Sequence, residues 1–293
     1  MVLTQSTTPS VSTIKAKKDV QTELVYWEKL PGRTKVIDFR TPEGEAEYKN
    51  IDQYNETHTA LIRDIRGDEA SYTLEKNGFQ YFKHEVTELD DWSNEKKVVD
   101  ILIPKTEELV REVTGATKII TFAHRIRCFA SHEAQLADNR APAHSVHSDF
   151  TAVGAAHHVE TLVTDPAELE RLRQTHRVMA INIWRPLKPV RRDPLAVCDW
   201  QTVDCEDEWI KNRFIFPSSW NELGKIAHSD RHAWYYLSDQ LPSEPLVFVQ
   251  YDSSRTAEGG RTLAHSAFVD PNSPANCPPR ESLEIKLFAF VPL

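Results

Sequence analysis

The chain is organised around residues 141–150, Ala-Pro-Ala-His-Ser-Val-His-Ser-Asp-Phe, which follow a run of residues typical of a β-strand. The stretch places His147 and Asp149 two positions apart. Residues i and i+2 of an extended chain point to the same face, so an imidazole and a carboxylate at this spacing can reach one common metal ion. The stretch therefore predicts two ligands of a metal site.

A third ligand is expected much later, at His265, ahead of an Arg-Glu-Ser sequence that begins the last apolar strand. Arg280 and Ser282 in that sequence again share one face of a strand. A buried guanidinium needs an anion, and a planar guanidinium beside a hydroxyl suits a carboxylate. Two histidines, one carboxylate and an anion-binding arginine are the arrangement of non-haem Fe(II) oxygenases. The alternative for Arg280 is a surface ion pair with Glu281 or Glu284.

His228 and Asp230 repeat the histidine-carboxylate pattern. His228, however, lies too close to His265 to leave room for an apolar strand at residues 246–251 and its turns. Residues 219–227 before it are polar and show no strand alternation. We therefore expect His228 in a solvated loop or at a helix end, not at the metal.

Two further histidines compete for the site. His158 forms the same pattern with Glu160, but it lies just before a helix start, which favours a surface or interface role. His144 is three residues from His147 and could turn inward if the loop bends. We expect it beside the ligands or in solvent.

Length and composition exclude several classes of protein. A chain of 293 residues with 40% hydrophobic content can bury a large core without disulfides, and its net charge of -9 argues against nucleic-acid binding. No apolar run approaches the roughly 20 residues of a membrane span, and no secretory signal is present. The four cysteines, Cys128, Cys198, Cys205 and Cys277, show no close spacing, which predicts free thiols and a cytosolic location.

The remaining pattern predicts a mainly β (α+β) protein. Residues 1–20 are expected to form a flexible arm that could dock against a second copy in a homodimer, and residues 21–293 one domain. Strands are expected at residues 34–40, 78–86, 117–128, 180–187, 246–251 and 281–291. One helix should run through Val98 to Gly115 with a kink at Pro104, and another from Asp165 to about Arg177. Returning strands with few helices favour an antiparallel sandwich or barrel with flanking helices.

Four segments carry a resemblance to a known family: residues 182–186, 194–199, 265–271 and 278–282. With the histidine-carboxylate pattern, they make most of the chain similar to the Fe(II)/2-oxoglutarate dioxygenase superfamily. The resemblance is closest to its fungal AsaB/GedK group, also called CmcJ/NvfI-like, of hydroxylases, desaturases and endoperoxide-forming enzymes. It implies a double-stranded β-helix, or jelly roll, although the segment Asp270–Pro279 lengthens the usual gap between His265 and Arg280.

The resemblance also implies residue roles and a reaction. His147, Asp149 and His265 would hold Fe(II), and Arg280 with Ser282 would hold the distal carboxylate of 2-oxoglutarate. With O₂, such an enzyme oxidises an unactivated C–H bond of a fungal secondary metabolite, and a terpenoid or meroterpenoid is favoured.

An apolar small-molecule substrate predicts an apolar pocket, for which the candidates are Phe150, Asn182 and Trp184. Arg185 would face the other way, in the family motif or in a structural ion pair. Two alternatives stay open on the residues alone: a jelly-roll Zn²⁺ hydrolase or isomerase, and a non-catalytic cupin-like binding module.

Overall fold

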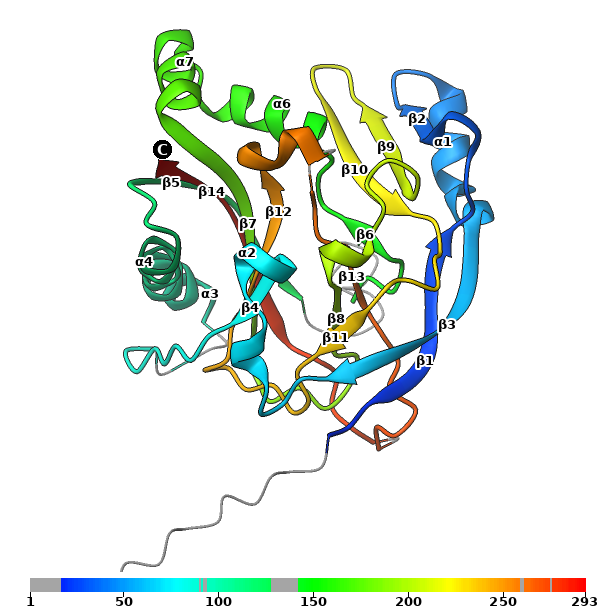
Figure 1. Ribbon diagram of the computed structural model, residues 1–293, viewed down its shortest axis with the longest axis vertical. Helices are drawn as coiled ribbons and strands as arrows, with labels where there is room; N and C mark the ends of the chain where they lie inside the picture. Colours follow the sequence, from blue (N-terminus) through cyan, green and yellow to red (C-terminus); the bar gives the residue numbers. More distant parts are fainter. Residues whose placement is uncertain (1–16, 90, 92–93, 128–141, 259–260, 275) are drawn as a thin grey trace, which may run out of the picture.

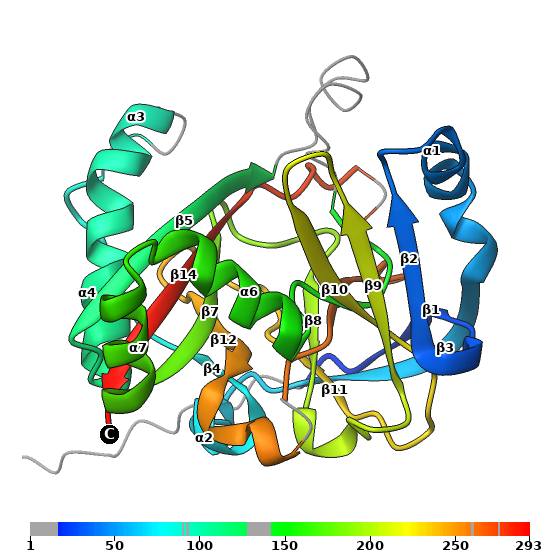
Figure 2. The same ribbon diagram turned by 90° about the horizontal axis from the view of Figure 1, so that it is seen from above.

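The fold consists of two β-sheets that face each other, with helices on the outside (Figures 1 and 2). The structure is a computed structural model. It describes residues 17–89, 91, 94–127, 142–258, 261–274 and 276–293. A mainly β jelly roll with flanking helices is what the sequence predicts, and it is confirmed.

The larger sheet has nine strands. Their order is β1 (Val20–Trp27), β3 (Asn55–Asp64), β11 (Trp234–Tyr236), β8 (Leu195–Cys198), β13 (His265–Ala267), β6 (His147–Ser148), β10 (Trp220–Ile226), β9 (Trp209–Ile215) and β2 (Thr34–Asp38). β11 runs parallel to β3, and β2 runs parallel to β9. The short strands β13 and β6 lie at the centre, so the predicted histidine ligands are in the middle of the sheet.

The smaller sheet has five antiparallel strands. Their order is β4 (Phe79–Tyr81), β12 (Leu246–Asp252), β7 (His176–Pro186), β14 (Ser282–Pro292) and β5 (Lys118–Arg127). β7 and β14 are almost entirely buried because one face meets helices and the other faces the larger sheet. Strands covered on both faces lose the polar alternation of a surface strand.

The helix predicted around Pro104 covers the outer face of the smaller sheet (Figure 2). It comprises α3 (Glu95–Lys97), a π-helical turn at Val98–Leu102 and α4 (Ile103–Thr114). The irregular turn falls just before Pro104, which lacks the N–H that a regular helix would use there. Gly115 ends α4 with φ 74°, the left-handed conformation that glycine adopts without strain.

The remaining helices border the sheets. They are α1 (Pro42–Lys49), α2 (Leu74–Asn77), α6 (Ala152–Leu162) and α7 (Pro166–Thr175), with short 3₁₀ turns at Pro31–Arg33, Ile51–Tyr54, Glu69–Ser71, Trp200–Thr202 and Ser253–Glu258. Asp165 caps α7 through the Ala167 N–H, as predicted. α7 ends at Thr175, two residues earlier than expected, because β7 already begins at His176.

Two segments correct the sequence interpretation. Residues 219–227, expected to lack a strand, contain β10, whose buried positions are Glu222, Gly224 and Ile226. A glutamate and a glycine on the buried face hid the alternation: Glu222 is paired with Arg213, and a Cβ at Gly224 would lie 2.7 Å from the Trp209 ring. The strand expected at residues 78–86 is shortened to β4.

Other expectations concern the chain ends and the thiols. Residues 1–16 of the predicted arm lie outside the described residues, and β1 begins at Val20. Cys198, Cys205 and Cys277 are free thiols, as predicted, whereas Cys128 lies outside the described part of the chain. Among the described residues, no helix has the length and apolar character needed to cross a membrane.

Candidate active site

The three predicted metal ligands lie together between the two sheets. His147 in β6 is directly opposite His265 in β13, and their ring centroids are 4.3 Å apart. Asp149 follows β6, with its carboxylate oxygens 3.9 Å from Nε2 of each histidine. The candidate ligand atoms all lie within 4.8 Å of one another. Donor atoms this close can share one metal ion at the usual bond lengths of about 2.1 Å.

Both imidazoles are oriented by backbone carbonyl groups. The Nδ1 atom of His147 donates to the Ser145 carbonyl at 2.8 Å, and that of His265 lies 3.4 Å from the Leu263 carbonyl. This places the proton on Nδ1 and turns Nε2 toward Asp149. Burial lowers the pKa of both histidines. Neutral imidazoles with a free Nε2 are the form that binds a metal.

The carboxylate of Asp149 is held from the smaller sheet. Lys286 in β14 donates to Oδ1 at 2.8 Å, and the amide of Asn182 in β7 donates to Oδ2. Burial alone would raise the pKa of Asp149, but the charge and the hydrogen bond of Lys286 lower it well below the usual value. The ionised, ligand-competent carboxylate is therefore the stable form.

Lys286 was missed by the sequence interpretation. Its signal is an alternation that leads into β14. Arg280, just before the strand, and Ser282, Glu284 and Lys286 within it are each two positions apart, and three of these side chains reach the metal site or its cavities. A series of polar residues at every second position of a buried strand marks a functional face.

A buried glutamine connects the two segments that carry the ligands. Gln250 in β12 accepts from the Asp149 backbone N–H at 2.6 Å and donates to the Leu263 carbonyl at 2.9 Å. It is fully buried, and the β12–β7 register skips it, which marks a β-bulge. A bulge turns a side chain away from its regular direction. Here the bulge turns Gln250 to the ligands, and no sequence pattern predicts it.

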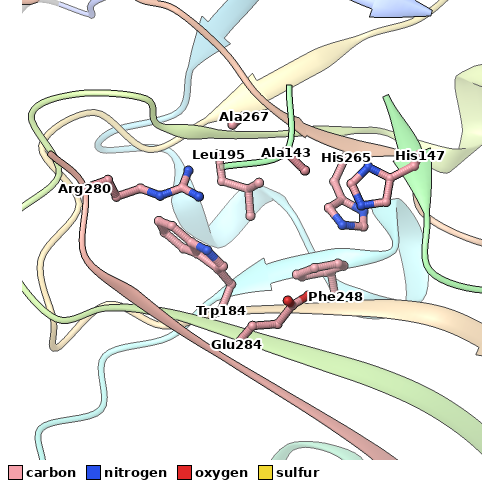
Figure 3. Close-up of a pocket in the computed structure, with 9 residues that line it drawn as sticks. All are labelled: Ala143, His147, Trp184, Leu195, Phe248, His265, Ala267, Arg280 and Glu284. Atoms are coloured by element: carbon pink, nitrogen blue, oxygen red, sulfur yellow. The ribbon is translucent and has the colours of Figure 1, made fainter. Parts of the chain in front are cut away.

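The arginine predicted to bind an anion faces the histidines across a narrow cavity of about 20 Å³ (Figure 3). Arg280 and the pair His147 and His265 lie at opposite ends, with Trp184 and Leu195 between them. The guanidinium carbon of Arg280 lies 5.1 Å from the centre of the Trp184 ring. Such stacking holds the guanidinium plane in place.

Further contacts of Arg280, and the positions of Ser282 and Glu284, bear on the predicted carboxylate site. Arg280 also donates to the carbonyl of Asp193, whose φ of 48° turns its backbone into the left-handed region. Ser282 is fully buried, and its hydroxyl has no hydrogen-bond partner among the described residues, although the residue does not line the cavity. Glu284, which the sequence suggested only as a surface partner of Arg280, is buried and lines the cavity.

A second, larger cavity of about 1120 Å³ opens beside the same triad. It shares Ala143 and His147 with the narrow cavity, so the two meet at the candidate metal site. Apolar residues lining the larger cavity are Ile51, Phe122, Phe150, Leu162 and Leu223. Charged residues lining it are Lys49, Asp52, Arg125, Asp149, Lys225 and Lys286. Phe150 lines the larger cavity and Trp184 the narrow one, and their place in a substrate pocket stays a prediction.

Asn182 occupies a different place from the one expected. It contacts Asp149 and, at 3.2 Å, Glu284, but it is not among the described residues that line either cavity. Arg185 faces away from the site, as alternation predicted. Its guanidinium binds the His84 carbonyl and ring and the Pro242 carbonyl, which are neutral groups and not the ion pair considered above.

The rival histidines lie elsewhere. His228 stacks on His58 with ring centroids 3.9 Å apart, and the side chain of Asp230 is fully exposed, so this pair is remote from the triad. His144 lines the larger cavity at 3.7 Å from Asp193. His158 lies in α6, a helix that the sequence interpretation missed, and packs 4.6 Å from the Phe122 ring. It also lines the larger cavity, whereas the sequence predicted a surface or interface role.

Comparisons with known proteins agree with this geometry. Residues 24–290 match the family described as oxidoreductase/YMDC permease-like domain. The hydroxylase/desaturase efuI of Hormonema carpetanum is 32% identical over 264 residues, covering 81% of this chain and 85% of that protein. The alpha-ketoglutarate-dependent dioxygenase phiK of a fungal species is 30% identical, covering 81% and 84%.

A solved structure shares the fold. The iron and alpha-ketoglutarate-dependent endoperoxidase NvfI superposes with a TM-score of 0.77 at 25% identity, covering 94% of this chain and 99% of that one. The resemblance stated from the motifs is thus confirmed by sequence relatives and by structure. The chain therefore belongs to the fungal AsaB/NvfI-like group of Fe(II)/2-oxoglutarate-dependent dioxygenases, oxidoreductases that use iron, 2-oxoglutarate and O₂ for hydroxylation, desaturation or endoperoxide formation.

Proposed function

We propose that His147, Asp149 and His265 hold the Fe(II) of this enzyme, and that Arg280 and Ser282 hold the distal carboxylate of 2-oxoglutarate. The observation that carries the proposal is the convergence of the three donor groups within 4.8 Å, from segments more than one hundred positions apart in the chain. The donor set fits Fe(II), which two imidazoles and one carboxylate bind with positions left for a co-substrate. The buried hydroxyl of Ser282 and the cation of Arg280 suit a carboxylate.

Iron bound with 2-oxoglutarate and O₂ supplies the oxidant for an unactivated C–H bond, and 2-oxoglutarate leaves as succinate and CO₂. The residues of the chain position and shield this chemistry. Asn182 and Lys286 orient the Asp149 carboxylate. Trp184 and Leu195 line the narrow cavity between the histidines and Arg280. The co-substrate would lie in this narrow cavity, between the histidines and Arg280.

For the substrate, we propose a small organic molecule with a large apolar part, bound in the larger cavity. Support comes from the volume and from the cluster of Phe122, Phe150 and Leu162 on its wall. Burial of apolar surface gives such a ligand its affinity. A terpenoid or meroterpenoid of fungal secondary metabolism fits this description.

The single domain, the cytosolic location and the homodimer remain predictions of the sequence.

The experiment is anaerobic addition of Fe(II) and 2-oxoglutarate to the purified full chain. We expect a weak visible charge-transfer band, and in air succinate formation that depends on 2-oxoglutarate. His147→Ala, Asp149→Ala and His265→Ala should each lose the band and bind Fe(II) at least tenfold more weakly, by analogy with the roughly 10- to 100-fold effect of outer-shell partners. His228→Ala is the matched control and should keep both.

The same measurement separates the other two classes. A Zn²⁺ hydrolase or isomerase with these ligands would show neither the band nor succinate, and a cupin-like binding module would form no succinate. Loss of the band in His228→Ala with retention in His147→Ala would contradict the ligand assignment.

A further inference from the structure

We propose that the ammonium group of Lys225 binds an anionic oxygen, such as a carboxylate, on the substrate that occupies the larger cavity. The inference rests on the proposed function, because it names a feature of the substrate of that same site. It changes the expected substrate from a purely apolar molecule to one with an apolar body and one acidic group.

Lys225 lies next to the candidate metal ligands. It is in β10 directly opposite His147 in β6, and His147 in turn is opposite His265 in β13. Residues directly opposite each other in antiparallel strands project to the same face, with Cβ atoms roughly 5 Å apart. Lys225 therefore projects to the face that carries the two histidines, and it lines the larger cavity with His147.

The ammonium group of Lys225 has neutral partners. Its Nζ donates to the Ser145 hydroxyl at 2.8 Å and lies 5.4 Å from the centre of the Trp27 ring. No carboxylate among the described residues lies within ion-pair distance, although Asp52 on the cavity wall attracts it from further away. Taking an ammonium group out of water costs free energy unless an anion compensates it. An anion in the cavity would provide that compensation.

Lys286 supplies an internal comparison. It also lines the larger cavity, but it forms an ion pair with Asp149 at 2.8 Å. The other cations of the wall, Lys49 and Arg125, are exposed to solvent. Lys225 is thus the half-buried cation of the described wall whose printed contacts are a hydroxyl and an aromatic ring. With Phe122 and Phe150 lining the same cavity, its wall suits an amphipathic anion.

The experiment uses two probes with the same ring system, 2-naphthoate and its neutral amide, 2-naphthamide. Their binding to the full chain is measured by calorimetry under anaerobic conditions with saturating Fe(II) and 2-oxoglutarate. Wild type should prefer the naphthoate. Lys225→Met keeps a long unbranched side chain but loses the charge, and should bind naphthoate about tenfold more weakly while binding the amide unchanged. Lys225→Arg should keep the preference.

Lys49→Met is the matched control, since Lys49 is an exposed cation of the same wall. It should change naphthoate binding by less than about twofold. The proposal is overturned if wild type shows no preference for naphthoate, if Lys225→Met leaves naphthoate binding unchanged, or if that variant weakens both probes equally. The charge-transfer band, recorded in each sample, shows whether iron and 2-oxoglutarate are still bound. Its absence in wild type would count against the proposed function, whereas an intact band with no naphthoate preference counts against Lys225 alone.

Discussion

At the scale of single residues, Arg280 carries the assignment of the co-substrate site. Arg280→Lys keeps the charge but loses the planar guanidinium, so we expect a KM for 2-oxoglutarate that rises at least tenfold with Fe(II) binding unchanged. Arg280→Ala should be worse, with a loss on the order of 3 to 5 kcal/mol of co-substrate binding. Ser282→Ala removes one hydrogen bond to a charged group and should cost about 1.5 to 3 kcal/mol.

The measurement for Arg280 is succinate formation across a titration of 2-oxoglutarate at saturating Fe(II). A KM within about twofold of wild type in Arg280→Ala would mean that the segment Asp270–Pro279 has shifted the carboxylate site to another cation. Arg125, which lines the larger cavity, would then be examined first.

The Trp184 side chain packs in the core and also contacts the guanidinium of Arg280. The side chain is 3% exposed, lies among Leu195 and Phe248, and supports the Arg280 guanidinium. Trp184→Ala should destabilise the fold by about 3 to 5 kcal/mol and raise the KM for 2-oxoglutarate. Trp184→Phe keeps most of the apolar volume and an aromatic face, so it should recover much of both. A melting temperature that falls in Trp184→Ala with an unchanged KM would assign Trp184 to packing alone.

At the scale of elements, the β-bulge at Gln250 joins the turn after β6 to the segment before β13. Gln250→Met has a similar volume but cannot make either hydrogen bond. Outer-shell partners of metal ligands affect affinity by roughly 10- to 100-fold, so we expect Co(II) to bind about tenfold more weakly. The measurement is a Co(II) titration followed by its visible absorption.

Gln240 provides the matched control for Gln250. It is also a buried glutamine, 2% exposed, and its amide donates to the Glu244 carbonyl at 2.6 Å in a loop away from the triad. Gln240→Met should lower the melting temperature and leave Co(II) affinity unchanged. Equal Co(II) affinities in the two variants would show that Gln250 has only a structural role.

At the scale of the whole molecule, the larger sheet is stabilised at a point distant from the site by Glu208. Its carboxylate accepts from Arg231 at 2.8 Å, from His232 at 2.9 Å and from the Asp204 N–H at 2.7 Å. Burial would raise the pKa of Glu208, but these hydrogen bonds lower it to about 2. A carboxyl group with a lowered pKa in the folded state stabilises the fold above its unfolded pKa. That contribution is lost as pH falls from about 4.5 to about 2.

The prediction is tested with Glu208→Gln. The difference in melting temperature between wild type and this variant should be largest and constant above pH 5, and should shrink steadily as the pH falls toward 2. The comparison with the variant removes the contributions of the titrating groups that do not contact Glu208; His232 does contact it. A difference that is independent of pH would mean that Glu208 stabilises the sheet by packing and not by its charge.

Much of the fold and of the site was predictable from local pattern. The final strand, the helix that ends at Gly115 and the cap at Asp165 each follow from residues that are neighbours in the chain. The pair His147 and Asp149 was predictable for the same reason, because strand geometry alone places i and i+2 on one face. Several elements were missed, among them β1, β3, β9, β10, α1 and α6. In β10 the buried face carries a glutamate and a glycine, which only their partners Arg213 and Trp209 explain.

The sequence by itself determined which residue types could bind iron and an anion, since donor chemistry and two-residue spacing are local properties. Tertiary structure alone decided that Lys286 and Asn182 donate hydrogen bonds to the Asp149 carboxylate. It also decided that Gln250, at the bulge, is hydrogen-bonded to both segments that carry the ligands, and that Lys225 lies opposite His147. Each of these contacts joins residues from 13 to 137 positions apart, as the sequence numbering shows. Their geometry depends on strand register and on the packing of the two sheets against each other. Residues that are adjacent in the chain do not determine either.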